Sequence, residues 1–188
     1  DAAASRLPTG SDPYTIRAEF QCGAYAHDEG VLFSHGAVAD NQLLSVAYHA
    51  STQTLTHAWG TSAATKQTKQ FVDSLCDDAW HEVIVSWDGE VKRMHLDGAE
   101  VAAEVVQTAL QHADAGDAFC LGGMTDGTEP WNGLVRNLEV YDYALTPLQL
   151  STPWGGGLDA TSGLADALVL DDASGRCLAR ESTDGAGL

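Results

Sequence analysis

The segment YTIRAEFQ, residues 14–21, alternates between largely apolar and polar side chains. A period of two residues is typical of a β-strand with one buried face, because successive side chains of a strand point to opposite sides. Short segments of similar character recur along the chain, separated by turn formers such as Asp88-Gly89 and Asp97-Gly98. The further expected strands are 31–34, 43–48, 54–59, 82–87, 91–96, 118–121 and 134–141.

Many short strands at close spacing, joined by glycine-rich turns, predict an all-β fold with two packed antiparallel sheets. One short helix is expected near the C-terminal end of this region, where Thr146 suits the N-cap and Pro147 the first helical position. Residues 151–153 should end it. A weaker helix candidate is 101–112, although Val105 and its neighbours suit a strand equally well.

The length of 188 residues predicts one well-buried domain with an appendage. We expect the sandwich to occupy residues 1–154. From Gly155 the composition changes to glycine, alanine, aspartate and serine, so 155–188 are interpreted as an extended C-terminal extension. With few large apolar groups, such a segment is either disordered or ordered only on a partner.

The charge balance limits the possible partners. The chain has 27 acidic and 9 basic residues and a formal net charge of -18. This charge repels phosphate backbones and anionic lipids, so nucleic acid is not expected as a partner. No apolar run is long enough to span a bilayer, so no transmembrane segment is expected. The first residue is Asp1 rather than methionine, which suggests that a targeting segment was removed or never included.

Four cysteines are spread along the chain without a C-x-x-C pair, which argues against a zinc knuckle or a thioredoxin-type redox site. An even number permits two disulfides in any of three pairings, and the spacing does not choose among them. The disulfide candidates are Cys22, Cys76, Cys120 and Cys177.

The segment HEVIV, 81–85, begins like the H-E-x-x-H zinc motif, but Val85 stands where the second histidine belongs. The run Val83-Ile84-Val85 favours a strand, in which residues four apart are separated by roughly 13 Å. A strand cannot bring both positions to one metal. His81 is therefore interpreted as a half-buried structural residue in a β-hairpin that turns at Asp88-Gly89.

The segment DAWHEVIVSWDG, 78–89, followed by MHLDG, 94–98, resembles the central hairpin of the concanavalin A-like lectin/glucanase superfamily, in particular its laminin-G-like modules. Further similar segments are LPTG at 7–10 with YTIRAEF at 14–20, GVLFSHG at 30–36, and WNGLVRNLEVY at 131–141 with ALTP at 144–147. The resemblance runs in order from Leu7 to Leu150. It implies a jelly-roll sandwich whose members bind sugars, proteins, lipids or calcium, or serve as structural decoration.

Two departures from that superfamily bear on activity. Its glucanase branch carries catalytic carboxylates as E-x-D-x-x-E on one strand, and no glutamate of this chain has that spacing. An acidic pair usual before the last strand is replaced by Arg136-Asn137, so a calcium site built on that pair is not expected. Nucleophile-elbow, phosphate-loop and dinucleotide motifs are also missing. The sequence therefore predicts a protein that is not an enzyme.

Candidate ligand-binding residues lie where a sandwich would present its rim loops. Trp59 could stack on a sugar ring, although a tryptophan in a strand is more often part of the core. Asp126, Thr128, Glu129 and Trp131 are further ligand-binding candidates in a glycine-rich loop. The alternative for the three polar residues is a solvated turn. The oxygens of Asp126 and Glu129 make calcium a possible ligand.

Two functions follow as hypotheses. The first is a non-catalytic, extracytoplasmic recognition module that binds glycan or protein through its rim loops. The second is an architectural subunit of a larger complex, in which the extension 155–188 docks on a neighbour.

Overall fold

The computed structural model forms two antiparallel sheets and describes residues 11–22, 29–39, 42–59, 67–71, 75–105, 119–150 and 176–178. The two-sheet antiparallel sandwich of a jelly roll, expected from the sequence, is confirmed. Its elements are β1 (Tyr14–Cys22), β2 (Glu29–Gly36), β3 (Leu43–His49), β4 (Thr54–Trp59), β5 (Gln67–Phe71), β6 (Trp80–Trp87), β7 (Val91–Leu96), β8 (Ala99–Val105), β9 (Phe119–Leu121), β10 (Gly133–Tyr141), α1 (Pro147–Leu150) and β11 (Arg176–Leu178).

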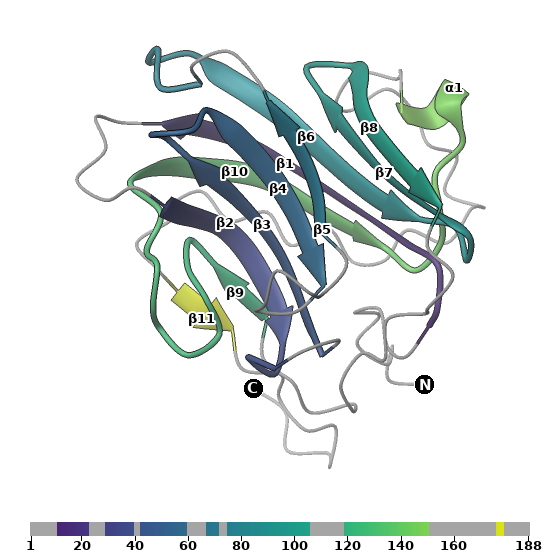
Figure 1. Cartoon of the computed structure of the whole chain (residues 1–188), viewed down its shortest axis with the longest axis horizontal. Helices are drawn as coiled ribbons and strands as arrows, with labels where there is room; N and C mark the ends of the chain where they lie inside the picture. Colours follow the sequence, from purple (N-terminus) through teal and green to yellow (C-terminus); the bar gives the residue numbers. More distant parts are fainter. Residues whose placement is uncertain are drawn as a thin grey trace.

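The two sheets lie one over the other (Figure 1). The small sheet has five strands in the order β10-β1-β6-β7-β8, and the large sheet has six in the order β11-β9-β2-β3-β4-β5. Neighbouring strands within each sheet are antiparallel throughout the described registers. Strands from distant parts of the sequence, such as β1 and β10, therefore become neighbours.

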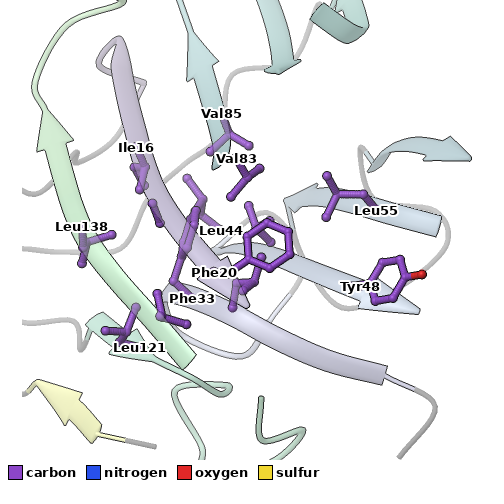
Figure 2. Packing of buried hydrophobic residues seen from close by; sticks show 14 of the residues in the cluster. Ile16, Phe20, Phe33, Leu44, Tyr48, Leu55, Val83, Val85, Leu121 and Leu138 are labelled. Carbon is purple, nitrogen blue, oxygen red and sulfur yellow. The ribbon is translucent and has the colours of Figure 1, made fainter. Parts of the chain in front are cut away.

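The core between the sheets follows the alternation of the first strand. Tyr14, Ile16, Ala18 and Phe20 are all fully buried, as the two-residue period predicted. Figure 2 shows Ile16 and Phe20 among side chains contributed by both sheets. Burial of this apolar surface supplies most of the driving force for folding.

The hairpin predicted at 80–96 is confirmed. Val83, Val85 and Trp87 of β6 and Met94 of β7 all point into the core. The strand geometry removes the zinc interpretation of this segment, because Val85 lies in the core beside Met94.

Three observed strands were not among the expected ones, although the region of the third was left open between helix and strand. Two of them, β5 and β11, lie in polar or glycine-rich sequence without clear alternation, and their backbone pairing with β4 and β9 places them in the large sheet. The third, β8, corrects the weak helix candidate at 101–112. Asp97 and Gly98 adopt φ of 50° and 79° and link β7 to β8 by a two-residue turn. Residues 101–105 are thus strand, and 106–112 lie outside the described residues.

The short helix α1 begins as predicted. The Gln149 amide donates to Thr146 Oγ1, and the Thr146 amide donates to Gln149 Oε1 at 2.9 Å, which together form a capping box. Leu145 and Leu150 bury Ile84 and Tyr141 on the outer face of the small sheet. Part of that face is therefore covered, which explains why the outward residue Arg17 is only 4% exposed.

One disulfide joins Cys22, at the end of β1, to Cys76, before β6. Cys120 on β9 is also disulfide-bonded, and the β9–β11 register places Cys177 opposite it. Within the predicted extension 155–188, the structure describes residues 176–178, which pair with the sandwich. The domain boundary at residue 154 stays a prediction. Among the described helices, none has the length and apolar character needed to cross a membrane.

Candidate functional site

One end of the sandwich gathers the turns that follow β3, β7 and β9. Gln21, near the end of β1, pairs with Trp80 at the start of β6 and with Leu134 near the start of β10. In the large sheet, Glu29 at the start of β2 pairs with His49 at the end of β3. Because the Cys22–Cys76 bond also lies at this end, we call it the disulfide rim.

The segment 122–132, which we call the rim loop, leads from β9 in the large sheet to β10 in the small sheet. Its backbone is held by its own hydrogen bonds: Met124 N donates to Thr128 O, and Trp131 N donates to Gly122 O at 3.0 Å. Val31 N of β2 donates to Glu129 O at 3.1 Å. These contacts fix the loop against the sheet and limit the ordering cost of binding a ligand.

Asp126, Thr128 and Glu129 are exposed on this loop. The Asp126 carboxylate accepts hydrogen bonds from the Thr128 hydroxyl at 2.7 Å and the Thr128 amide at 3.0 Å, and these bonds lower its pKa. Although Glu129 is exposed as a residue, partial desolvation of its carboxyl and the negative charge of Glu29 raise its pKa. At neutral pH the Asp126 carboxyl is therefore ionised. As the pH falls, Glu129 is expected to take up a proton before Asp126 does.

The structure thus brings Asp126, Thr128 and Glu129 together on one exposed loop, as the sequence suggested. It adds Glu29 and His49 beside them, with His49 Nε2 lying 3.3 Å from a Glu29 carboxylate oxygen. The sequence did not reveal this pair, because the β2–β3 register brings the residues together. Calcium binding stays a prediction: within the described ranges, no group of three or more His, Cys, Asp or Glu side chains is arranged to hold a metal.

The structure places both candidate tryptophans in the core rather than at a ligand-binding surface. Trp59 is fully buried, and its indole N–H donates to the Tyr14 hydroxyl at 2.9 Å inside the core. Trp131 is 7% exposed and packs edge-on against Phe20, with ring centroids 5.5 Å apart. Neither ring offers an exposed face on which a sugar could stack, because each is packed among other buried side chains.

A second polar cluster on the disulfide rim surrounds His81. Its Nδ1 lies 2.8 Å from an Asp97 oxygen and its Nε2 lies 3.1 Å from an Asp77 oxygen. Burial alone would lower the pKa of His81, but hydrogen bonds and charges from Asp97 and Asp77 raise it overall. His81 clamps the 97–98 turn to the segment after Cys76, a structural role consistent with its interpretation from sequence.

The sequence profile of the concanavalin A-like lectin/glucanases superfamily matches residues 2–151. The chain belongs to this superfamily. The match spans β1 to α1, which include the small sheet, the rim loop and the strands of the large sheet other than β11. There is no match to this chain among the curated proteins.

Solved structures share the fold. A protein of Bacteroides ovatus ATCC 8483 assigned as carbohydrate binding is 19% identical, with a TM-score of 0.65, over 89% of this chain and 48% of its own. The CBM40 of the Ruminococcus gnavus IT-sialidase is 14% identical, with a TM-score of 0.62, over 76% of this chain and 82% of its own. Domains LG4-5 of the mouse laminin alpha1 chain are 17% identical, with a TM-score of 0.53, over 71% of this chain and 37% of theirs.

Proposed function

We propose that the chain is a non-catalytic recognition module that binds glycan through the rim loop. The observation that carries the proposal is the hydrogen-bonded loop 122–132, which holds the polar groups of Asp126, Thr128 and Glu129 toward solvent. Carboxylate and hydroxyl oxygens in fixed positions accept hydrogen bonds from sugar hydroxyls. A sugar-binding role also fits similar structures, one of which is a CBM40 bound to alpha2,6 sialyllactose.

A non-catalytic role is supported by the carboxylates of the chain. Glycosidases of this fold class need two carboxyl groups roughly 5 to 9.5 Å apart across a substrate cleft. The sequence has no E-x-D-x-x-E strand. Within the described small sheet, Glu19 and Glu82 are engaged by Arg136 and Arg17. Their ion pairs suit structural side chains better than a general acid.

An extracytoplasmic location is part of the proposal. Disulfides persist in oxidising compartments, and both Cys22–Cys76 and the bonded Cys120 fit such a setting. The alternative function is a subunit whose C-terminal extension docks on a neighbour. The position of residues 176–178 gives this alternative less support. These residues pair with β9 of the same chain.

A glycan array tests the proposal, probed with the purified chain in calcium and in EDTA. We expect binding to a defined set of glycans, weakened in Glu129→Gln and Asp126→Asn, which keep the size of the side chains. Glu90→Gln is the matched control, because it removes one exposed charge from the 88–90 turn at the opposite end of β6. Silence on the array, or equal binding by all variants, would count against the rim loop.

A further inference from the structure

A second exposed surface lies on the outer face of the small sheet, beside the disulfide rim. The register places Leu134, Gln21 and Trp80 in one row across β10, β1 and β6, and Arg136, Glu19 and Glu82 in the next. Leu134 is 48% exposed, and the Arg136 side chain is 40% exposed. We call the surface formed by Glu19, Gln21, Trp80, Leu134 and Arg136 the Arg136 platform.

The guanidinium of Arg136 is held in one orientation. Its Nε donates to Glu19 Oε2 at 2.7 Å, and Asn137 Nδ2 donates to the same oxygen at 2.7 Å. Its Cζ lies 3.8 Å from the centre of the Trp80 ring, in cation–π contact. Asn137 has φ of 52° and lies at a register irregularity between β1 and β10. This irregularity places the side chains of Arg136 and Asn137 beside each other, so that both reach Glu19.

The terminal nitrogens of Arg136 remain available for a ligand. Within the described part of the chain, its polar contacts are made through Nε, so the N–H groups of both Nη atoms keep their donor capacity. A guanidinium edge is a planar fork that matches the two oxygens of a carboxylate. Because the side chain is already fixed, little rotamer entropy is lost when it binds.

Other cationic side chains described by the structure are less suited to this role. Arg17 is buried and bonded to Glu82, and Lys92 is fully buried. Arg93 is shared between Asp88 and Glu100. Among the cations whose side chains the structure describes, Arg136 has the most exposed side chain in an ion pair, 40% against 32% for Arg93, and it is bound to one carboxylate rather than two.

The local charge permits an anion to approach. Glu19 is compensated by Arg136, and Glu82 by Arg17, so the two rows of the platform are close to neutral. Elsewhere on the disulfide rim, Asp77, Asp97, Asp126 and Glu129 would repel an anion.

The platform is small. Toward α1 the same face of the sheet is covered, since Ile84 and Tyr141 are buried under Leu145 and Leu150. Two rows on three strands span roughly 10 Å by 7 Å, given strand spacings of about 4.8 Å and a rise of about 3.4 Å per residue. That area accommodates one sugar ring, and it is far below the roughly 800 Å² per partner of a stable protein interface.

We propose that the Arg136 platform binds a carboxylate-bearing sugar unit. The carboxylate pairs with the Nη edge of Arg136, and the ring of the sugar contacts Leu134 and the exposed part of Trp80. This site is separate from the rim loop and does not rest on glycan binding there.

Titration of the ¹⁵N-labelled chain with single sugars tests the platform, with glucuronic acid and N-acetylneuraminic acid as two carboxylate sources and glucose as the neutral control. We expect saturable shifts of the Arg136 Nε–H and Trp80 indole signals with one or both acids, and none with glucose. Arg136→Gln should raise the dissociation constant of the acidic sugar at least about tenfold, since it removes a charge-assisted bidentate contact. Arg136→Lys keeps the charge and should also weaken binding, because an ammonium lacks the planar fork.

Arg93→Gln is the matched control, because it removes one positive charge from the same sheet and should leave binding unchanged. Equal loss in Arg93→Gln would assign the effect to net charge and overturn the proposal. So would absence of binding by the parent chain at millimolar sugar, equal shifts with glucose, or unchanged affinity in both Arg136 variants. Glu129→Gln separates the two sites. This rim-loop variant should bind the acidic sugars at the platform as the parent chain does, whether or not the rim loop binds glycan.

Discussion

Individual residues in the core explain why Trp59 is not a surface residue. Its indole N–H donates to Tyr14 Oη, which also lies 3.0 Å from His57 Nε2. Lys92 from the other sheet donates to the His57 carbonyl at 2.8 Å, and its Nζ lies 4.8 Å from the centre of the Trp59 ring. The side chains of Tyr14, His57 and Trp59 thus meet between the sheets. The His57 backbone carbonyl and the Trp59 ring give Lys92 a polar partner and a cation–π contact, which lets a lysine occupy a fully buried position.

Removal of the Tyr14 hydroxyl should destabilise the fold. In Tyr14→Phe the Trp59 N–H loses its acceptor inside the core, and a buried donor left unsatisfied costs about 1–3 kcal/mol. Urea unfolding followed by tryptophan fluorescence measures the change. Glu90→Gln, at an exposed position of the 88–90 turn, serves as control and should shift the free energy of unfolding by less than about 0.5 kcal/mol. A smaller loss in Tyr14→Phe than in the control would show that the Tyr14 hydroxyl does not stabilise the core.

The His81 clamp should make stability depend on pH. Its folded pKa lies above the ordinary value of 6.5, so its contribution is fully present below that value and is lost as the pH rises through the folded pKa. The stability difference between the parent chain and His81→Gln should therefore be larger at about pH 5.5 than at about pH 8.5. An NMR titration of the His81 ring checks the pKa directly. Asp97→Asn should lower the pKa of His81, and an unchanged pKa in that variant would exclude Asp97 as the cause of the shift.

Elements pair according to backbone geometry that side-chain patterns only partly reveal. The strand β1 has clear alternation, whereas β5 is polar and β11 has three residues, and these two strands are placed by the ladders of β4 and β9. The rim loop adopts its shape because its amides bond to Thr128, Gly122 and β2 rather than through any motif of its own. Disulfides add covalent links between elements. The Cys22–Cys76 bond closes a loop with a sequence separation of 54. On the chain-entropy model, the lost entropy of the unfolded chain raises the free energy of unfolding by about 4 kcal/mol.

The second disulfide is predicted to join Cys120 to Cys177. Cys120 is disulfide-bonded, Cys22 and Cys76 bond to each other, and the β9–β11 register sets Cys177 opposite Cys120. Mass spectrometry of the non-reduced, protease-digested chain should yield a linked peptide that contains both residues and disappears on reduction. Alkylation of Cys120 in the unreduced, denatured chain would contradict this pairing.

At the scale of the whole molecule, acidity dominates the electrostatics. With 27 acidic and 9 basic residues, and several of the basic ones in ion pairs or buried, most surface charge is negative. Such a surface keeps the protein away from polyanions, and mutual repulsion opposes the compact state. Against this background the Arg136 platform is close to neutral, whereas the rim loop exposes the carboxyl groups of Asp126 and Glu129.

Added salt should stabilise the fold. Raising sodium chloride from about 0.02 M to about 0.5 M shortens the screening length well below 10 Å, so repulsion among the excess carboxylates weakens. We expect Tm to rise in differential scanning calorimetry at neutral pH. A fall in Tm would mean that the surface ion pairs, which salt also weakens, outweigh the net repulsion.

The sequence by itself determined the class of fold and most of its strands. A two-residue period and glycine-rich turns act locally, so they predicted β1, the 80–96 hairpin and the capped start of α1 without knowledge of the rest of the chain. They also placed Asp126, Thr128 and Glu129 in one loop, since these residues are adjacent in sequence. The same local rules left the disulfide pairing open and could not decide whether Trp59 faced solvent or core.

Tertiary structure decided which distant residues meet. The register of β1 against β6 and β10 brings Arg136 over Trp80, and the hairpin turn at 97–98 brings Asp97 to His81. Trp59 is buried because its strand faces β1 and β7 across the sandwich, where Tyr14 and Lys92 provide its polar contacts. Such contacts depend on strand order, register and sheet packing, which the periodicity of a single segment does not encode.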